Sequence, residues 1–425
     1  MRRTKTQPHV TPIAQRCSPR TSNSPPPSAA RTLMEPRRIG STSYDLAFLI
    51  DILNEHDELY PKFIKIENVA EKLVSENRGF GSNIYSVRLT SGEGEEYSFV
   101  CKIPTVEYLN KYLHEANEES KKFSEKELEE QEEINLTQVR ETHNREVDFY
   151  RFAKENIPKS VKIPRFIYGE YMTEENECII IMEDLSDRAH KGPSKGLSKE
   201  EAFQMVDTIC DIHLHCLLHQ QFIEKNFQPV DSLIKCLKAF ITLSAHDLLE
   251  NEDYTWFTPE LAEKTIALSE YDKLMKVMAS RPELGMPPVI CQGDLWPSNV
   301  LWEHKSDGMR HLLSIIDWQD CYIGSYANDL ASLLAINMDA ETRKSCEQDV
   351  LRYYVEKMNE YKKSFNLDID LTYDKAWIAY KKAIQVAILI TMTIVENPED
   401  VVENGENMGR ITKRLVHMLE DAEFE

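Results

Sequence analysis

The sequence has no long apolar run. No segment reaches the ~20 consecutive apolar residues that a membrane-spanning helix needs. The best candidate, residues 383–395, contains Gln385 and follows Lys381 and Lys382. These polar residues favour a helix buried in a globular core, so we expect no membrane span.

Cysteine pairs and positive charge are also scarce. The nine cysteines are dispersed and none forms a C-x-x-C pair, which predicts reduced thiols in a cytoplasmic protein. The formal net charge is −22, so a nucleic acid is not expected as a partner. Basic residues outnumber acidic ones in residues 1–40, which hold eight Arg or Lys and one acid, Glu35.

Residues 1–40 are predicted to form a disordered basic tail. They contain three consecutive prolines, many Ser, Thr and Arg residues, and few large apolar side chains, as is typical of disordered segments. An organelle-targeting peptide is the alternative interpretation, because the segment is rich in Arg and Ser and poor in acids.

Residues 41–183 are predicted to form an N-terminal lobe built on a β-sheet. Segments 65–75, 83–90 and 97–103 alternate apolar and polar residues and are separated by glycines, which predicts antiparallel strands. Residues 107–133 are packed with Glu and Lys and predict a charged helical insertion with i,i+4 ion pairs. A second helix is expected over residues 138–155.

Residues 184–425 are predicted to form a larger, helical C-terminal lobe. Ser198 followed by Glu201 is a capping box that opens a helix ending near residue 222, and further helices are expected at 230–249, 259–280, 326–336, 342–365, 373–395 and 406–420. A small sheet-rich half followed by a helical half indicates an α+β fold of two lobes.

The strongest chemical signal is a D-x₄-N motif between apolar segments. Asp294 and Asn299 follow the apolar run 289–291, and Asp317 ends a second apolar run at 312–316. Phosphoryl transfer needs a carboxylate to orient the attacking hydroxyl, and an amide oxygen and a second carboxylate to hold Mg²⁺ against the phosphates. Asp and Asn also favour turns, but the ordered combination favours the functional interpretation.

A second signal is a lysine inside an apolar strand. Lys102 lies in the run Phe-Val-Cys-Lys-Ile, where burial of its charge would be unfavourable without a partner. Glu146 in the following helix is a candidate partner, because kinases pair a strand Lys with a helix Glu to hold nucleotide phosphates. A strand-edge Lys with an exposed ammonium group is the alternative.

A glycine-containing turn precedes that strand. Gly79 and Gly81 lie between two predicted strands, and glycines let backbone N–H groups approach phosphates closely. A G-x-G turn is a weak signal alone, but its place one strand before Lys102 makes residues 41–183 the predicted nucleotide-binding lobe.

These motifs together resemble the CHK-kinase-like family, also called ecdysteroid kinase-like, which occurs in nematodes and insects and is related to choline kinases and aminoglycoside phosphotransferases. The resemblance covers roughly residues 60–400. The residues that carry it are Gly79-Phe-Gly81, Lys102, Glu146, Ile181-Met-Glu-Asp-Leu185, Gln292-Gly-Asp294-x₄-Asn299 and Ile316-Asp317-Trp318-Gln319.

The resemblance implies a two-lobed protein-kinase-like fold that phosphorylates a small-molecule hydroxyl with ATP and Mg²⁺. It implies that Asp294 is the catalytic base and that Asn299 and Asp317 ligate Mg²⁺. It further implies that Lys102, paired with Glu146, positions the phosphates. Residues 183–185 would form the hinge whose backbone meets adenine, including Glu183 and Leu185, and Asp329 would brace the catalytic loop.

The chain departs from the family pattern at one site position. Many relatives carry His where this chain has Gln292, so the bracing of the catalytic loop is expected to differ. The D-F-G and A-P-E signatures of protein kinases are absent, which favours a small acceptor over a protein.

Two other groups of residues have less specific interpretations. His213, His215 and His219 share one predicted helix but lack the glutamate of the zinc-protease pattern, so we expect packing histidines. Trp296 and Trp318 flank the motif residues and could either line an acceptor pocket or pack the loop.

The leading functional hypothesis is ATP- and Mg²⁺-dependent phosphorylation of a small alcohol, with a steroid-like or other lipophilic acceptor implied by the resemblance. The first alternative is a non-catalytic pseudokinase or ligand-binding regulator. The second is a choline or ethanolamine kinase, since an acidic protein attracts cationic amines. The acceptor and the oligomeric state are not predicted by the sequence.

Overall fold

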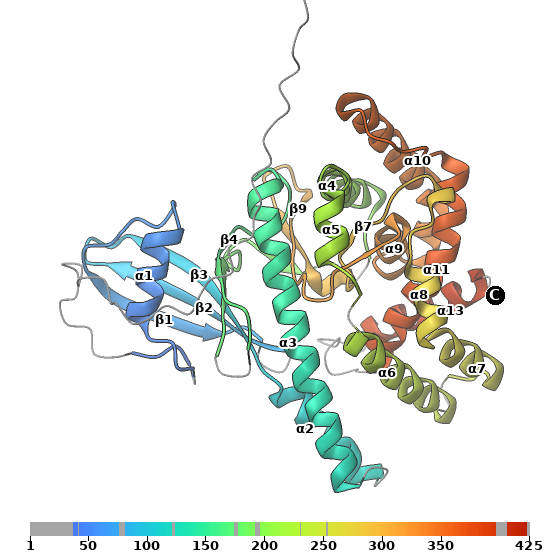
Figure 1. Ribbon diagram of the computed structural model, residues 1–425, viewed down its shortest axis with the longest axis horizontal. Coiled ribbons are helices and arrows are strands. Elements are labelled where there is room, and N and C mark those ends of the chain that lie inside the picture. Colours follow the sequence, from blue (N-terminus) through green and yellow to red (C-terminus); the bar gives the residue numbers. More distant parts are fainter. Residues whose placement is uncertain are drawn as a thin grey trace, which may run out of the picture.

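The computed structural model describes residues 37–40, 42–75, 81–120, 124–173, 177–191, 196–229, 231–251, 254–396 and 406–422. The predicted basic tail lies almost entirely outside the described residues, as does Gly79. A sheet-based lobe and a helical lobe lie side by side, with the long helix α3 (Glu125–Asn156) between them (Figure 1). The predicted α+β fold of two lobes is confirmed.

The N-terminal lobe is a five-stranded antiparallel sheet in the order β1-β2-β3-β5-β4. The strands are β1 (Ile66–Leu73), β2 (Ser82–Ser91), β3 (Glu96–Pro104), β4 (Phe166–Gly169) and β5 (Ile180–Glu183). Alternate residues of β2, such as Val87 and Leu89, are fully buried, as expected for a sheet with one face on a core. Helix α1 (Leu46–His56) packs its Leu49 and Leu53 in the same apolar cluster.

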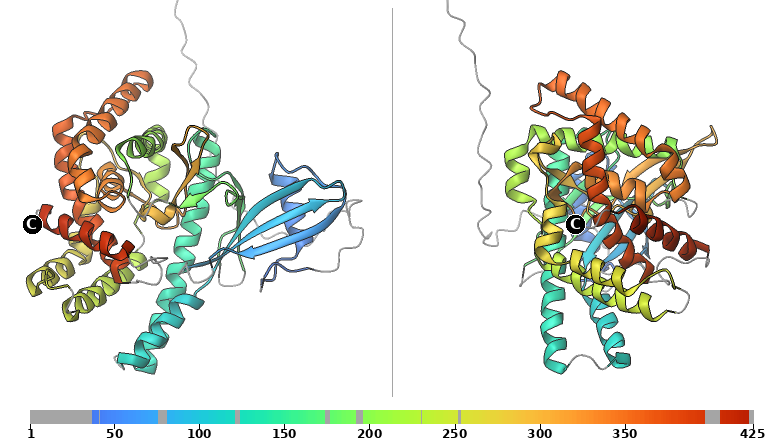
Figure 2. Two further views of the ribbon diagram at one scale, coloured as in Figure 1. Left: turned by 180° about the vertical axis from the view of Figure 1, so that it is seen from behind. Right: turned by 90° about the vertical axis from the view of Figure 1, so that its right-hand side faces the viewer.

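The charged insertion forms a helical hairpin that projects from the body of the molecule (Figure 2). Its first arm is α2 (Glu107–Ser120), and its second arm is the first half of α3. A capping box between Ser124 and Glu127 starts α3 early, so the predicted helix at 138–155 is the second half of a 32-residue helix. Only this second half carries enough apolar residues to be buried between the lobes, among them Val147 and Phe149.

The C-terminal lobe is helical, as predicted. Its helices are α4 (Lys199–Leu218), α5 (Gln220–Asn226), α6 (Asp231–Glu250), α7 (Pro259–Leu268), α8 (Tyr271–Met278), α9 (Tyr326–Ala331), α10 (Ala340–Phe365), α11 (Tyr373–Glu396) and α13 (Glu406–Asp421). The Ser198–Glu201 capping box opens α4. The single helix expected at 259–280 is instead two, because the chain breaks at Ser269 and Glu270, where the backbone of Glu270 is extended.

Helix α11 contains one stretch, Tyr373–Val395, that is long and apolar enough to cross a membrane by length and composition alone. Within its most apolar window, however, 72% of the helix is buried inside the protein. It packs against α6, α8, α9 and α13. Most of its apolar residues therefore face the protein interior, as expected for the core helix predicted over residues 383–395.

Two small sheets in the C-terminal lobe carry the predicted site. Strand β7 (Val289–Cys291) pairs with β10 (Tyr322–Gly324), and β8 (Val300–His304) lies between β6 (His190–Lys191) and β9 (Arg310–Ile315). Residues 292–299 join β7 to β8, and residues 316–321 join β9 to β10. These two connections therefore emerge beside each other and face β3 of the other lobe.

Candidate active site

The loop after β7 is shaped by a glycine. Gly293 has φ of +89°, and a Cβ atom at this position would overlap the carbonyl carbon and oxygen of Asp320. Only glycine accepts this backbone conformation at so close an approach. The turn brings residues 292–294 against the 316–321 connection and leaves Asp294 half-buried between the two.

Asn299 closes the loop that Asp294 opens. Its Nδ2 donates to Asp294 Oδ2 at 2.8 Å and to the Asp294 carbonyl oxygen at 2.9 Å. Because the Asn299 amide nitrogen is used in this way, its Oδ1 is directed away from Asp294. The D-x₄-N spacing thus produces a contact in which the two polar side chains fix each other.

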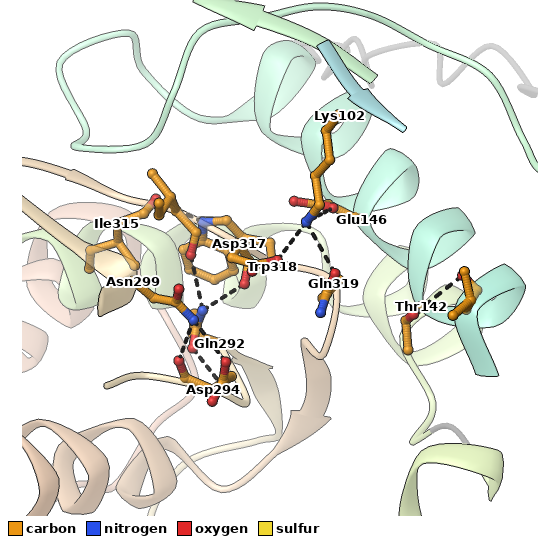
Figure 3. A network of polar contacts seen from close by, with 12 residues as sticks. Lys102, Thr142, Glu146, Gln292, Asp294, Asn299, Ile315, Asp317, Trp318 and Gln319 are labelled. Atoms are coloured by element: carbon orange, nitrogen blue, oxygen red, sulfur yellow. Dashed lines mark hydrogen bonds and ion pairs between the residues drawn. The ribbon is translucent and has the colours of Figure 1, made fainter. Parts of the chain in front are cut away.

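Gln292 connects this loop to the segment carrying Asp317 (Figure 3). Its Nε2 donates to the carbonyl oxygens of Ile316 at 3.1 Å and Asp317 at 2.7 Å, while its Oε1 accepts the Asp294 N–H at 2.7 Å. Its own N–H donates to Asp329 Oδ1 at 2.9 Å, so Asp329 makes the bracing contact that the resemblance implies. A glutamine amide, with two donor hydrogens and an acceptor oxygen, serves all three side-chain contacts at once.

Asp317 adopts a left-handed conformation, with φ of +58°, which is uncommon outside glycine and tends to occur at functional sites. The Gln292 bond to its carbonyl holds this conformation. The Asp317 carboxylate turns toward the N-terminal lobe, where Oδ1 accepts from Lys102 Nζ at 2.6 Å. This contact joins the two lobes directly.

Lys102 on β3 is buried and pairs with the predicted partner. Its Nζ lies 2.7 Å from Glu146 Oε2 on α3, with the side chains 5% and 1% exposed. Burial would lower the pKa of Lys102, but the carboxylates of Asp317 and Glu146 outweigh burial and raise it. The exposed strand-edge alternative is therefore wrong, and Lys102 remains a cation between the lobes.

The polar site around Lys102 contains more carboxyl groups than cationic groups. Burial, followed by the charges of Asp320 and Asp317, raises the pKa of Asp294 well above its usual range. Burial and the Asp317 charge also raise the pKa of Asp320 to about 7, although Lys102 and Arg145 act in the opposite direction. The charged forms of these carboxyl groups are therefore disfavoured on the side of the C-terminal lobe that faces Lys102, and a divalent cation would stabilise them.

Sequence reasoning missed Asp320 as part of this cluster. The only signal was its spacing, three residues after Asp317. Two further contacts keep its segment in place: the close approach to Gly293, and a hydrogen bond of 3.1 Å from Arg145 on α3 to the carbonyl oxygen of Cys321. Neither contact can be inferred from the spacing alone.

The residues predicted to hold Mg²⁺ have suitable donor atoms. Asp317 Oδ2 and Asn299 Oδ1 are oxygen ligands, which Mg²⁺ prefers, and neither has a hydrogen-bond partner among the described residues. The described part of the chain contains no group of three His, Cys, Asp or Glu side chains that could hold a metal by themselves. A site with two protein ligands fits Mg²⁺, which usually keeps waters and phosphate oxygens as its other ligands.

The remaining predicted nucleotide contacts lie around this network. Gly81 begins the segment into β2 and faces the side chain of Gln319. Glu183 ends β5, where its Oε1 accepts the Arg165 N–H at 2.7 Å, and the Leu185 carbonyl accepts the N–H of Ala189 at 2.9 Å. Glu183 and Leu185 thus lie where the chain passes between the lobes, outside the polar network.

The structure separates the two tryptophans. Trp318 is 1% exposed, stacks on Phe149 with ring centroids 3.9 Å apart, and donates its indole N–H to Ile315 at 3.0 Å. It packs the loop against α3. Trp296 is half-buried in the same loop as Asp294, and its backbone N–H donates to the Asp294 carbonyl oxygen at 3.0 Å, so of the two tryptophans only Trp296 is exposed enough to meet an acceptor.

The three histidines of α4 are packing residues. His213 is fully buried between Tyr354, whose hydroxyl lies 2.8 Å from Nδ1, and Asp329, whose Oδ2 lies 3.3 Å from Nε2. The rings of His215 and His219 stack with centroids 6.4 Å apart. His213 supports Asp329 and, through Asp329, the loop that carries Gln292 and Asp294.

Comparison with known proteins identifies relatives of the whole folded region. Residues 65–423 match the DUF1679 family, which is described as "Uncharacterized oxidoreductase dhs-27". The Uncharacterized oxidoreductase dhs-27 of Caenorhabditis elegans is 24% identical over 275 residues, covering 60% of this chain and 32% of that protein. This chain therefore spans about a third of the length of that relative.

A second relative is closer in length. The Uncharacterized kinase-like protein D1044.1 of Caenorhabditis elegans is 24% identical over 324 residues, covering 71% of this chain and 80% of that protein. Among solved structures, choline kinase from Cryptosporidium parvum aligns with a TM-score of 0.48 and 12% identity, covering 88% of this chain and 94% of that one.

The family match covers both lobes and every predicted site residue. It agrees with the kinase-like relative and confirms the resemblance to the CHK-kinase-like proteins. The chain belongs to the DUF1679 family.

Proposed function

We propose that the protein transfers the γ-phosphoryl group of ATP to a hydroxyl group of a small molecule. The observation that supports this most is one continuous polar network across the two lobes, from Glu146 through Lys102, Asp317 and Gln292 to Asp294 and Asn299 (Figure 3). It combines a buried cation, a half-buried carboxylate and oxygen ligands, which are the parts that phosphoryl transfer requires.

Each group has a role in this proposal. Lys102, fixed by Glu146, would hold the nucleotide phosphates, and the turn at Gly79 and Gly81 would cover them. The backbone at Glu183 and Leu185 would meet the adenine.

Asp294 would accept the proton of the acceptor hydroxyl, and burial raises its pKa, which makes its carboxylate a stronger base than an exposed aspartate. Asp317 and Asn299 would hold Mg²⁺, which, when bound, neutralises phosphate charge. The crowding of carboxylates around one lysine supports this assignment.

The acceptor belongs to the same proposal. A small alcohol, steroid-like or otherwise lipophilic, is the class that the family resemblance favours, and half-buried Trp296 beside Asp294 offers an apolar wall for it.

A cytoplasmic location is supported by the seven described cysteines that are free and buried. The oxidoreductase name of one relative belongs to a protein about three times as long as the matched segment, so it gives no support for an oxidoreductase activity of this chain.

A pseudokinase is the competing function, since the same fold can bind a ligand without catalysis. Thermal unfolding with and without Mg·ATP tests nucleotide binding, because a ligand bound to the folded state raises Tm. A screen of a metabolite pool for Mg·ATP-dependent phosphorylation then tests catalysis, with Asp294→Asn as the blank. Choline and ethanolamine belong in that screen as defined acceptors.

Phosphorylation of a pool component by the wild-type protein and not by Asp294→Asn would support the proposal. A Tm increase with Mg·ATP but no phosphorylation of any component would favour the pseudokinase.

A further inference from the structure

The side chain of Gln319 lies between Lys102 and Gly81. Its Oε1 accepts from Lys102 Nζ at 3.1 Å. A Cβ atom added to Gly81 would lie 3.9 Å from Gln319 Oε1 and 4.0 Å from Nε2, closer than to any other group. The amide therefore lies beside the Lys102 ammonium group, where a phosphate held by Lys102 would have to bind (Figure 3).

The ammonium group of Lys102 is fully used in this arrangement. A lysine has three N–H donors, and Nζ lies near three acceptors: Asp317 at 2.6 Å, Glu146 at 2.7 Å and Gln319 at 3.1 Å. Lys102 can contact a phosphate only if one acceptor yields its place.

Gln319 is the acceptor that a phosphate can most easily replace at Lys102. Glu146 is 1% exposed, and separating a buried carboxylate from its only close cation would be strongly unfavourable. Asp317 is charged and makes the shortest contact. Gln319 is neutral, makes the longest contact and is half-buried, so its exchange for an anionic phosphate oxygen would strengthen the interaction with Lys102.

We propose that Gln319 is a phosphate-binding residue of the nucleotide site. In the empty site its Oε1 accepts from Lys102. When a nucleotide binds, a phosphate oxygen takes that place, and the amide turns to donate its Nε2–H to the same phosphate. An amide side chain carries both an acceptor oxygen and donor hydrogens, so it can accept from the lysine in one state and donate to the phosphate in the other. This inference rests on the proposed function, since it assumes that the cleft binds a nucleotide.

Calorimetric titration with adenosine, Mg·ADP and Mg·ATP tests the inference in the full chain. Gln319→Met keeps the length and loses both hydrogen-bonding atoms. We expect its Kd for Mg·ATP to rise about 10-fold, as for the loss of one hydrogen bond to a charged group. Its Kd for adenosine, which has no phosphate, should stay within about 2-fold of the wild-type value, a difference too small to reflect a lost hydrogen bond.

Gln319→Glu is the second variant. A glutamate still accepts from Lys102 but has no donor and places a negative charge next to the phosphates, so we expect the Kd for Mg·ATP to rise on the order of 100-fold. The matched controls are Gln131→Met and Gln131→Glu, because Gln131 lies on the projecting half of α3 and bonds only locally to Asn135. Thermal unfolding of each variant checks that it is folded.

Two outcomes would overturn this inference but leave the proposed function standing. In the first, Gln319→Met binds Mg·ATP as tightly as the wild-type protein. In the second, its affinities for adenosine and for Mg·ATP fall equally, as expected for a merely structural role. If the wild-type protein binds neither Mg·ADP nor Mg·ATP, the proposed function fails and this inference fails with it.

Discussion

Gln292 Nε2 donates to the carbonyl oxygen of Asp317 at 2.7 Å, and this bond ties the catalytic loop to the residue with the left-handed backbone. The same side chain accepts the N–H of Asp294. Asp294 and Asp317, 23 positions apart in the chain, therefore owe their relative placement to one amide. The family resemblance implies a His at this position, and this glutamine provides one donor more than a neutral imidazole.

The first prediction concerns that amide. Gln292→Ala leaves two carbonyl oxygens and one N–H without their partner, so we expect a loss of about 1–3 kcal/mol in the free energy of unfolding. We also expect kcat to fall about 10-fold or more, because small misplacements of catalytic groups are costly. Gln292→His should recover part of both losses. Urea denaturation and steady-state kinetics check these outcomes, and an alanine variant equal to the wild-type protein in both would show that the bracing is unimportant.

The second prediction concerns the buried ion pair. Lys102→Met leaves Glu146 in the interior without its cation, so we expect a loss of about 3–5 kcal/mol in unfolding free energy. The double variant Lys102→Met/Glu146→Met removes both charges and should regain most of that stability. Neither variant should bind Mg·ATP measurably.

A double-mutant cycle by urea denaturation measures the coupling between these two residues. Additive losses would show that the 2.7 Å contact contributes little. Mg·ATP binding by the double variant would show that Lys102 does not hold the phosphates.

The third prediction concerns pH. Asp320 titrates at about pH 7 in the folded protein because it is buried beside Asp317, whereas an unfolded aspartate titrates near pH 4. Between these values the folded state binds more protons than the unfolded state, so the free energy of unfolding rises as pH falls from 8 toward 5. Without nucleotide, the protein should thus be more stable at pH 6 than at pH 8.

Asp320→Asn removes this charge. We expect it to raise Tm at pH 8 by roughly 2–4 °C and to flatten the dependence of Tm on pH. The matched control is Asp307→Asn, since Asp307 lies in the exposed turn between β8 and β9. If Asp320→Asn lowered Tm at pH 8, the carboxylate would be stabilising rather than repelled.

Much of this site could be predicted from the sequence because its parts sit at fixed places in local patterns. Lys102 lies in an alternating strand, and Asp294 and Asn299 lie in one tight loop, so spacing alone indicated their proximity. The pairing of Lys102 with Glu146 could be predicted because kinases pair a strand Lys with a Glu of the helix that follows. The start of α3 at Glu125 was harder, because its first half has no apolar face and depends on the Ser124 cap.

Residues defined by tertiary contact could not be predicted. Gln319 and Asp320 acquire their surroundings only when the 316–321 connection meets Gly293 and Lys102. The break between α7 and α8 is likewise set by packing, since no Gly or Pro marks it. Local sequence patterns predict neither the tertiary contacts of residues 316–321 nor the break between α7 and α8.

The most direct test of the proposed chemistry is the turnover of Asp294→Asn with an acceptor that the wild-type protein phosphorylates. The account predicts that kcat falls by on the order of 10²–10⁴, the range for loss of a general base. It also predicts that the Kd for Mg·ATP, measured by calorimetry, stays within about 3-fold, since the phosphates are held by Lys102 and not by Asp294. Turnover at the wild-type rate would contradict the role assigned to Asp294 and, with it, the account of this cleft as a phosphotransferase site.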